Sequence, residues 1–431
     1  MTEAGTKSRW RRHAIDLSPL RHTAYRRLFV GNAVSFVGYQ FTAVAVPVQM
    51  YALTRSSLWV GLLGVAGFVP LLVFGLWGGA IADAFDRRRV LLGSSALMWA
   101  ATFGLLVQAL VIARLPASAR DHWAPPAILL VLVAVQSTAF AISSPTRSAI
   151  IPRLMPESEV SVASTLNHTV SSFASVVGPL LAGVLIVVVD VSAAYAVDAA
   201  LFTVAMWAAL KLPAVPPARG EKEEAPATAG WRDVTDGLRY LGAQPVLLLT
   251  FAIDIAAMVL AMPRAVFPEV ADERFGTGSI GWLYASIAIG SVLAGLTSGW
   301  IGRVRRQGLA VIVAVVAWGL AVAAAGAAPW LWLVIVLLAA AGAADMISAV
   351  YRQTIALTYA HDAMRGRLQG VFFAVVAGGP RLGDLRIGVT AVLVGPTVAW
   401  VGGGLAAVVV AVLLAAGFPA LARYTPNGSR G

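Results

Sequence analysis

Two aspartates, Asp254 and Asp345, each stand deep inside an apolar run of about twenty residues, the length that crosses a bilayer core. A carboxylate at that depth is costly and usually faces a cavity or a partner. Desolvation disfavours its charged form, so it can hold a proton and release it when water reaches it. We therefore predict both as proton-coupling candidates, Asp254 first. The alternative is a permanent structural pair with Arg264 or Arg352.

Other polar groups in the apolar runs are candidates for the lining of a substrate cavity, since intramembrane polar side chains usually face the protein interior. They are Gln40, Gln136, Arg264, Arg352, Arg381 and Asp384. Arg381 and Asp384 stand three residues apart and can pair on one helical face. Glycines and Pro380 beside them predict an irregular helix, with a gating or a purely structural role left open.

The composition shows which elements must position these groups. Of 431 residues, 59% are hydrophobic and 12% charged, and the mean hydropathy of +0.79 excludes a soluble enzyme. We predict an all-α polytopic membrane protein with twelve transmembrane helices in two pseudo-symmetric six-helix bundles. The predicted spans are 28–53, 58–82, 89–113, 126–145, 162–189, 193–211, 246–267, 279–301, 309–327, 330–353, 368–393 and 396–420.

Lys and Arg together are about five times as numerous on the side of the membrane that holds both termini as on the other side. This bias predicts cytoplasmic termini in the cell membrane of a bacterium, and it explains the net charge of +11 without nucleic-acid binding. The predicted organisation is a tail (1–27), a first bundle (28–211), a cytoplasmic linker with an amphipathic segment (212–245), a second bundle (246–423) and a short tail (424–431). With no cysteine and scattered histidines, we expect no metal site and no cofactor.

Two motifs resemble those of the major facilitator superfamily. The loop after the second span holds Gly79, Asp83, Arg87 and Arg88, which resemble its motif A, although Asp86 stands where many members have Gly. In the fifth span Gly178, Pro179 and Gly183 resemble motif C, the antiporter signature of its exporters. A proline and small residues let this helix bend and pack closely against a neighbour.

The second half adds Met262-Pro263-Arg264, Asp345-Met346-Ile347-Ser348 and Gly379-Pro380-Arg381, which resemble the enterobactin-exporter and transmembrane secretion effector branch. The resemblance implies a proton-driven exporter that works by alternating access. Its substrate would be a small amphipathic molecule such as a siderophore or another secondary metabolite. The resemblance also implies a monomer whose partners are that small molecule, protons and the lipid bilayer. One alternative is a multidrug or macrolide efflux pump. Another, from a different class, is a membrane sensor or enzyme, but the sequence contains no catalytic motif that would support it.

Overall fold

The computed structural model describes residues 16–116, 122–214, 239–359 and 365–425, without the side chains of 76–84, 359 and 365–374. These residues form helices joined by short turns, and no strand occurs among them. The long helices are α2 (Thr23–Thr54), α3 (Ser57–Ala84), α4 (Arg87–Arg114), α6 (Ala124–Ile150), α7 (Glu157–Val188), α8 (Val191–Leu210), α10 (Pro245–Ala261), α12 (Ile280–Leu296), α13 (Gln307–Ala327), α14 (Leu331–Tyr359), α15 (Arg365–Val394) and α16 (Pro396–Gly417).

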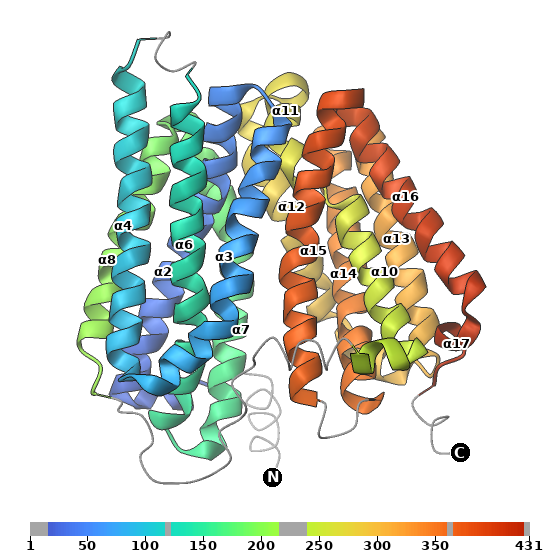
Figure 1. The fold of residues 1–431 in the computed structure, drawn as a ribbon, viewed down its shortest axis with the longest axis horizontal. Coiled ribbons are helices and arrows are strands. Elements are labelled where there is room, and N and C mark those ends of the chain that lie inside the picture. Colours follow the sequence, from blue (N-terminus) through green and yellow to red (C-terminus); the bar gives the residue numbers. More distant parts are fainter. Residues whose placement is uncertain (1–15, 117–121, 215–238, 360–364, 426–431) are drawn as a thin grey trace, which may run out of the picture.

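The helices form two bundles that stand side by side (Figure 1), α2 to α8 in one and α10 to α16 in the other. The start of α2 and the short helix α17 (Pro419–Ala422) lie at the same end of the molecule, which we call the terminal side; the other end is the opposite side. Most of the predicted linker, 215–238, lies outside the described residues. The twelve long helices and the two bundles confirm the predicted fold class.

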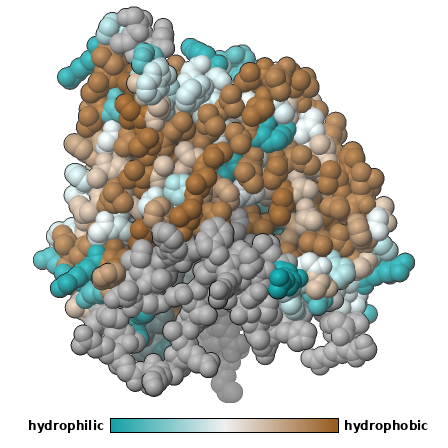
Figure 2. Space-filling model, viewed as in Figure 1, coloured by the Kyte–Doolittle hydropathy of each residue, from teal (hydrophilic) through white to brown (hydrophobic). Residues whose placement is uncertain are grey.

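Eleven helices in the described part of the chain are long and apolar enough to cross a membrane. Hydrophobic residues cover most of the described face in Figure 2, and hydrophilic ones gather toward its two ends. The remaining long helix, α15, has 30 residues but carries Arg381, Asp384 and Arg386. Its charged groups are met by neighbouring elements, as described below, so α15 is the predicted eleventh span in spite of its polarity.

The predicted seventh span, 246–267, lies within Pro245–Phe275, a segment long and apolar enough to cross a membrane, but it is not one continuous helix, because α10 ends at Ala261. Proline disfavours a helical conformation in the residue before it, and Met262, before Pro263, has an extended backbone with φ −69° and ψ 119°. The chain continues through short turns: η3 (Arg264–Val266), α11 (Phe267–Val270), the π-helical turn η4 (Ala271–Phe275) and η5 (Thr277–Ser279). We call residues 262–279 the connecting segment.

The arginine of α15 that lies farthest along the chain satisfies backbone near this break. Arg386 donates from Nε to the carbonyl of Val259, 3.3 Å away, and from Nη1 to the carbonyl of Ala399 in α16, 3.2 Å away. Carbonyls freed near a helix end must find donors inside the protein at membrane depth. The prediction of an irregular α15 was wrong, since α15 is continuous past Pro380; the irregular backbone is at the end of α10.

Candidate functional site

A cavity of about 590 Å³ lies between the two bundles. Its walls come from the middle parts of α2 and α7 in the first bundle and from α10, α12, α13, α14 and α15 in the second. Predicted residues that line it are Gln40, Asp254, Arg264, Asp345 and Arg352. A central cavity at a bundle interface is where a helical membrane protein can bind a small molecule.

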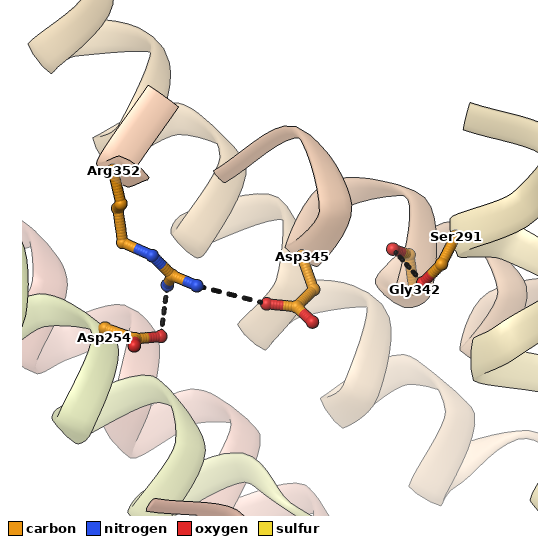
Figure 3. Close-up of polar contacts among 5 residues, drawn as sticks. All are labelled: Asp254, Ser291, Gly342, Asp345 and Arg352. Atoms are coloured by element: carbon orange, nitrogen blue, oxygen red, sulfur yellow. Dashed lines mark hydrogen bonds and ion pairs between the residues drawn. The ribbon is translucent and has the colours of Figure 1, made fainter. Parts of the chain in front are cut away.

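One wall of the cavity carries three charged side chains in contact (Figure 3). Arg352 on α14 forms a short ion pair from Nη1 to Oδ1 of Asp254 on α10. Its Nη2 lies 3.6 Å from Oδ1 of Asp345, which precedes Arg352 by seven residues on α14. The partner of Asp254 is therefore on another helix. It is not Arg264, which follows Asp254 by ten residues and is too far along the chain for a direct pair. We call Asp254, Asp345 and Arg352 the acidic cluster, because two carboxylates share one guanidinium.

The members of the acidic cluster differ in their access to the cavity. The side chains of Asp254 and Arg352 are only 4% and 6% exposed, whereas that of Asp345 is 32% exposed. An ion pair this deeply buried depends on both partners, because removal of one leaves an uncompensated charge in a poorly solvated place. The Asp345 carboxylate contacts Arg352 and is also open to the cavity, while the buried pair of Asp254 and Arg352 joins α10 to α14.

Close packing of α12 on α14 fixes the helix that carries Asp345 and Arg352. Ser291 on α12 donates a hydrogen bond of 2.9 Å to the carbonyl of Gly342 (Figure 3). A Cβ at Gly342 would overlap the backbone carbonyl of Ile287, and one at Gly290 would overlap that of Ala339. Glycines let two helix backbones approach closely, so they set the position of Asp345, which follows Gly342 by three residues.

A second set of charges lies where the connecting segment meets α15. Arg264 Nη2 is 3.3 Å from Oδ2 of Asp384, and the Arg264 side chain is 40% exposed while that of Asp384 is 15% exposed. Arg381 also acts electrostatically on Asp384, and its guanidinium packs against Gly67 of α3. We call Arg264, Arg381 and Asp384 the basic cluster.

This geometry corrects two details of the prediction. Asp384 forms its ion pair with Arg264 rather than with Arg381, since the Arg381 side chain turns to α3. Neither Asp384 nor Arg381 is among the residues that line the cavity; Asp384 reaches it only through Arg264.

The first-bundle wall of the cavity is neutral. It consists of Tyr39, Gln40, Ala43 and Val44 from α2, with Ser175 and Pro179 from α7. Gln136 does not line the cavity, because its Nε2 donates to Thr102 Oγ1 at 3.1 Å inside the first bundle. The hydroxyls of Thr42 and Thr102 donate hydrogen bonds to Oδ2 of the buried Asp198. These bonds join helices within the first bundle and are structural.

Sequence reasoning missed several lining residues, among them Met258, Tyr284 and Trp318. Met258 follows Asp254 by four residues and therefore lies on the same face of α10, a spacing that could have identified it. Tyr284 and Trp318 belong to α12 and α13, which carry no charge in their apolar runs. Hydropathy alone gives no signal for which of their faces meets the cavity.

The motif C residues lie in the contact between the bundles. A Cβ at Gly183 on α7 would come within 2.6 Å of the Cα of Gly281 on α12, and Gly281 packs against the Pro179 carbonyl. Gly178 lies against Gln40 of α2. All these contacts are in the half of α7 that runs toward the opposite side, so the bundles close together there.

Polar contacts complete this closure between the first bundle and the connecting segment. Arg55 pairs closely with Asp272, and Ser57 donates a short hydrogen bond to Glu269. Tyr51 Oη lies 3.4 Å from Oε1 of Glu273. Figure 1 shows α11 at this end, beside the start of α3. We call these contacts, together with the packing of Gly183 on Gly281, the opposite-side seal; sequence reasoning did not foresee its polar part.

Substitution Gly183→Val is expected to open the seal, because its branched side chain has no room against the Gly281 backbone. The natural chain has no cysteine, so Ser57→Cys supplies one thiol at a site only 1% exposed. A membrane-impermeant maleimide should label Ser57→Cys slowly and the Gly183→Val/Ser57→Cys protein many times faster. Gly402→Val/Ser57→Cys, with the added valine on α16 where a Cβ meets no atom within 4 Å, is the control and should be labelled as slowly as Ser57→Cys. Equal labelling of all three proteins would contradict the assignment of Gly183 to the seal.

For motif A, the side chains of Gly79 and Asp83 lie outside the described residues. Arg87 Nη1 donates to the Ala149 carbonyl at 3.4 Å and Arg88 Nη2 to the Leu210 carbonyl at 2.7 Å. Asp86 caps α4 by accepting from the backbone N–H of Arg88 at 2.8 Å. The aspartate found in place of a common Gly is therefore the residue that begins α4.

Comparisons with known proteins agree with this architecture. The chain is 29% identical over 411 residues to the enterobactin exporter EntS of Shigella boydii serotype 18, and 28% identical to EntS of Escherichia coli O139:H28, with 93% of each chain covered in both cases.

Solved structures are similar in fold. The nucleoside transporter NupG aligns with a TM-score of 0.73 at 14% identity, covering 93% of this chain and 100% of its own. A D-xylose–proton symporter aligns with a TM-score of 0.68 at 13% identity, covering 91% and 97%. The sequence model of the family described as transmembrane secretion effector matches residues 14–423. The chain thus belongs to the transmembrane secretion effector family, and it is a membrane transporter of the major facilitator type.

Proposed function

We propose that this protein exports a small amphipathic molecule, a siderophore or a similar secondary metabolite, from the cytoplasm of a bacterium in exchange for protons. The observation that carries the proposal is the central cavity, which has a charged wall and is closed by the bundles on one side. The similarity to enterobactin exporters over 93% of the chain supports the direction and the kind of substrate.

The topology gives the seal its meaning in this proposal. Arginines crowd the terminal side, among them Arg87, Arg88, Arg303, Arg305 and Arg306. The positive-inside rule then makes the terminal side cytoplasmic, and the seal faces the exterior. A cavity closed on the exterior is one of the two states that alternating access requires, and rocking of the bundles about the cavity would produce the other.

The acidic cluster supports coupling to protons. Asp254 and Asp345 are acids beside one arginine in the cavity wall. Protonation of one carboxylate removes one of the two negative charges beside the Arg352 guanidinium. A bound molecule can favour or oppose that protonation by its own charge. Substrate and proton can therefore compete for the same centre, as antiport needs.

Everted vesicles that contain the protein test the proposal directly, because their outward face is the cytoplasmic one. With an acidic lumen they should accumulate metal-free enterobactin, and a protonophore should abolish the accumulation. Vesicles without the protein give the background. Accumulation that ignores the protonophore would contradict proton coupling, and no accumulation above background would contradict export of this siderophore.

Efflux of cationic drugs is the second candidate, and the exposed Asp345 carboxylate in the cavity favours it. The two candidates differ in ligand charge. If catechol siderophores raise the thermal midpoint of the purified protein and a cationic macrolide does not, siderophore export is supported. A response to the macrolide alone would replace it with drug efflux.

A further inference from the structure

The charges on the second-bundle wall are sorted by sign into two places. The acidic cluster has two carboxylates and one guanidinium, and the basic cluster has two guanidiniums and one carboxylate. The first-bundle wall opposite them contributes only neutral side chains to the cavity. Of these groups, the acidic cluster and Arg264 line the cavity, so a ligand meets the acidic cluster and the guanidinium of Arg264 on the same wall.

In each cluster one charged side chain is open to the cavity. Asp345 is 32% exposed and Arg264 is 40% exposed, whereas Asp254 and Arg352 hold each other at 4% and 6%. Both Asp345 and Arg264 line the cavity. The groups that a ligand can reach are thus one carboxylate and one guanidinium.

Arg264 has unused hydrogen-bonding capacity. A guanidinium carries five N–H donors, and the printed contact of Arg264 with a described acid is a single one of 3.3 Å to Asp384. Its Nε is buried and has no hydrogen-bond partner among the described residues, and the same is true of Asp384 Oδ1. A paired fork of N–H groups fits the two oxygens of a carboxylate or a catecholate.

Apolar side chains lie between the acidic cluster and Arg264 along the chain. Met258 and Met262 line the cavity at positions four and eight residues beyond Asp254, on the way to Arg264. The seven residue steps of regular helix from Asp254 to Ala261 correspond to roughly 10 Å, and Arg264 lies past the end of that helix. Tyr284 and Trp318 add aromatic surface to the same region, and methionines adapt to varied ligand shapes.

We propose that the cavity binds dipolar amphipathic molecules, in which an apolar, aromatic body separates an acidic group from a basic group. The acidic oxygens bind Arg264, the cationic nitrogen binds Asp345, and the body packs on Met258 and Met262. This inference rests on the proposed function, in that it takes the cavity as the substrate site, and it predicts that among small amphipathic molecules those with both charges bind most tightly.

A matched set of four probes isolates each charge. 4′-(Aminomethyl)biphenyl-4-carboxylic acid carries the two charges at opposite ends of an aromatic body, its primary amide carries only the ammonium, its N-acetyl derivative only the carboxylate, and the N-acetyl amide neither. Their equilibrium binding is measured on the purified full-length protein in nanodiscs, without any gradient. We expect the dipolar probe to bind at least about tenfold more tightly than the neutral one.

Two variants assign the charges to residues. Arg264→Gln should weaken the two carboxylate-bearing probes about tenfold and leave the amide unchanged, and Asp345→Asn should weaken the two ammonium-bearing probes and leave the N-acetyl derivative unchanged. Arg264→Lys keeps the charge and should recover part of the carboxylate binding. Arg114→Gln, an exposed arginine at the end of α4, removes the same charge outside the cavity and should bind all four probes as the natural protein does.

Several outcomes would overturn the inference. These are equal binding of the four probes, no measurable binding of any of them, or an equal loss of all probes in Arg264→Gln. The result is separable from the test of export. Charge-selective binding without vesicle transport would contradict the proposed function alone, and proton-driven transport with charge-blind binding would contradict this inference alone.

Discussion

Asp254→Asn is expected to abolish accumulation against a gradient while downhill exchange of substrate continues. The substitution keeps the shape of the side chain but removes the carboxylate that can take up a proton. Arg352 keeps one carboxylate partner in the variant, because Asp345 remains 3.6 Å away. The protein should therefore fold, at a cost below the about 3–5 kcal/mol of a buried charge that loses its partner completely.

The measurement compares two assays on the same proteoliposomes. In the first, an imposed pH gradient drives accumulation, and in the second, labelled substrate exchanges with unlabelled substrate at equal pH. Asp345→Asn, which removes the same charge from the second proton-coupling candidate, is compared in the same two assays. An undiminished response of Asp254→Asn to the pH gradient would exclude Asp254 as the obligatory proton carrier.

Gly342→Ala is expected to have a large structural effect for so small a substitution. A single methyl group at this position would overlap the backbone carbonyl of Ile287, which cannot move away as a flexible side chain could. Helices α12 and α14 must separate, and the hydrogen bond of Ser291 to Gly342 is lost with them. Overpacking of this kind costs about 1–3 kcal/mol, and it displaces Asp345 and Arg352 from Asp254.

Thermal unfolding and substrate binding together test this prediction. Gly342→Ala should lower the thermal midpoint and weaken binding, whereas Gly402→Ala on α16, with nothing within 4 Å of the added methyl group, should leave both unchanged or raise stability slightly through helix propensity. Ser291→Ala removes only the hydrogen bond, at about 1 kcal/mol. Natural stability and binding in Gly342→Ala would mean that α12 and α14 are not packed as closely as described.

The spans and their grouping could be predicted because long apolar runs report bilayer crossing directly. The end of α10 was misplaced although Pro263 was noted, since hydropathy continues through Val266 and Phe267 and does not register the break. The sequence offered Arg264 and Arg352 as possible ion-pair partners of Asp254, and in the structure the partner is Arg352.

Contacts between the bundles could not be predicted. Arg55 and Asp272 are 217 residues apart in sequence, and the contact of Gly183 with Gly281 joins helices of different bundles. Helical periodicity indicates which residues share a face of one helix, but it holds no information on the register of one bundle against another. The sorting of the cavity charges into two clusters depends on that register, and therefore required the structure.

The three charges in the second half of α15, Arg381, Asp384 and Arg386, also bear on how the chain enters the membrane. An Arg or Asp at the centre of a lone helix opposes insertion by about 2.5–3.5 kcal/mol, so α15 by itself is a poor substrate for the insertion machinery. Asp384 meets Arg264, and Arg386 meets carbonyls of Val259 and Ala399. The first two partners are synthesised long before α15, but Ala399 belongs to the helix that follows it. We therefore expect α15 to integrate stably only once α16 has been made, as a helical hairpin against the preassembled α10.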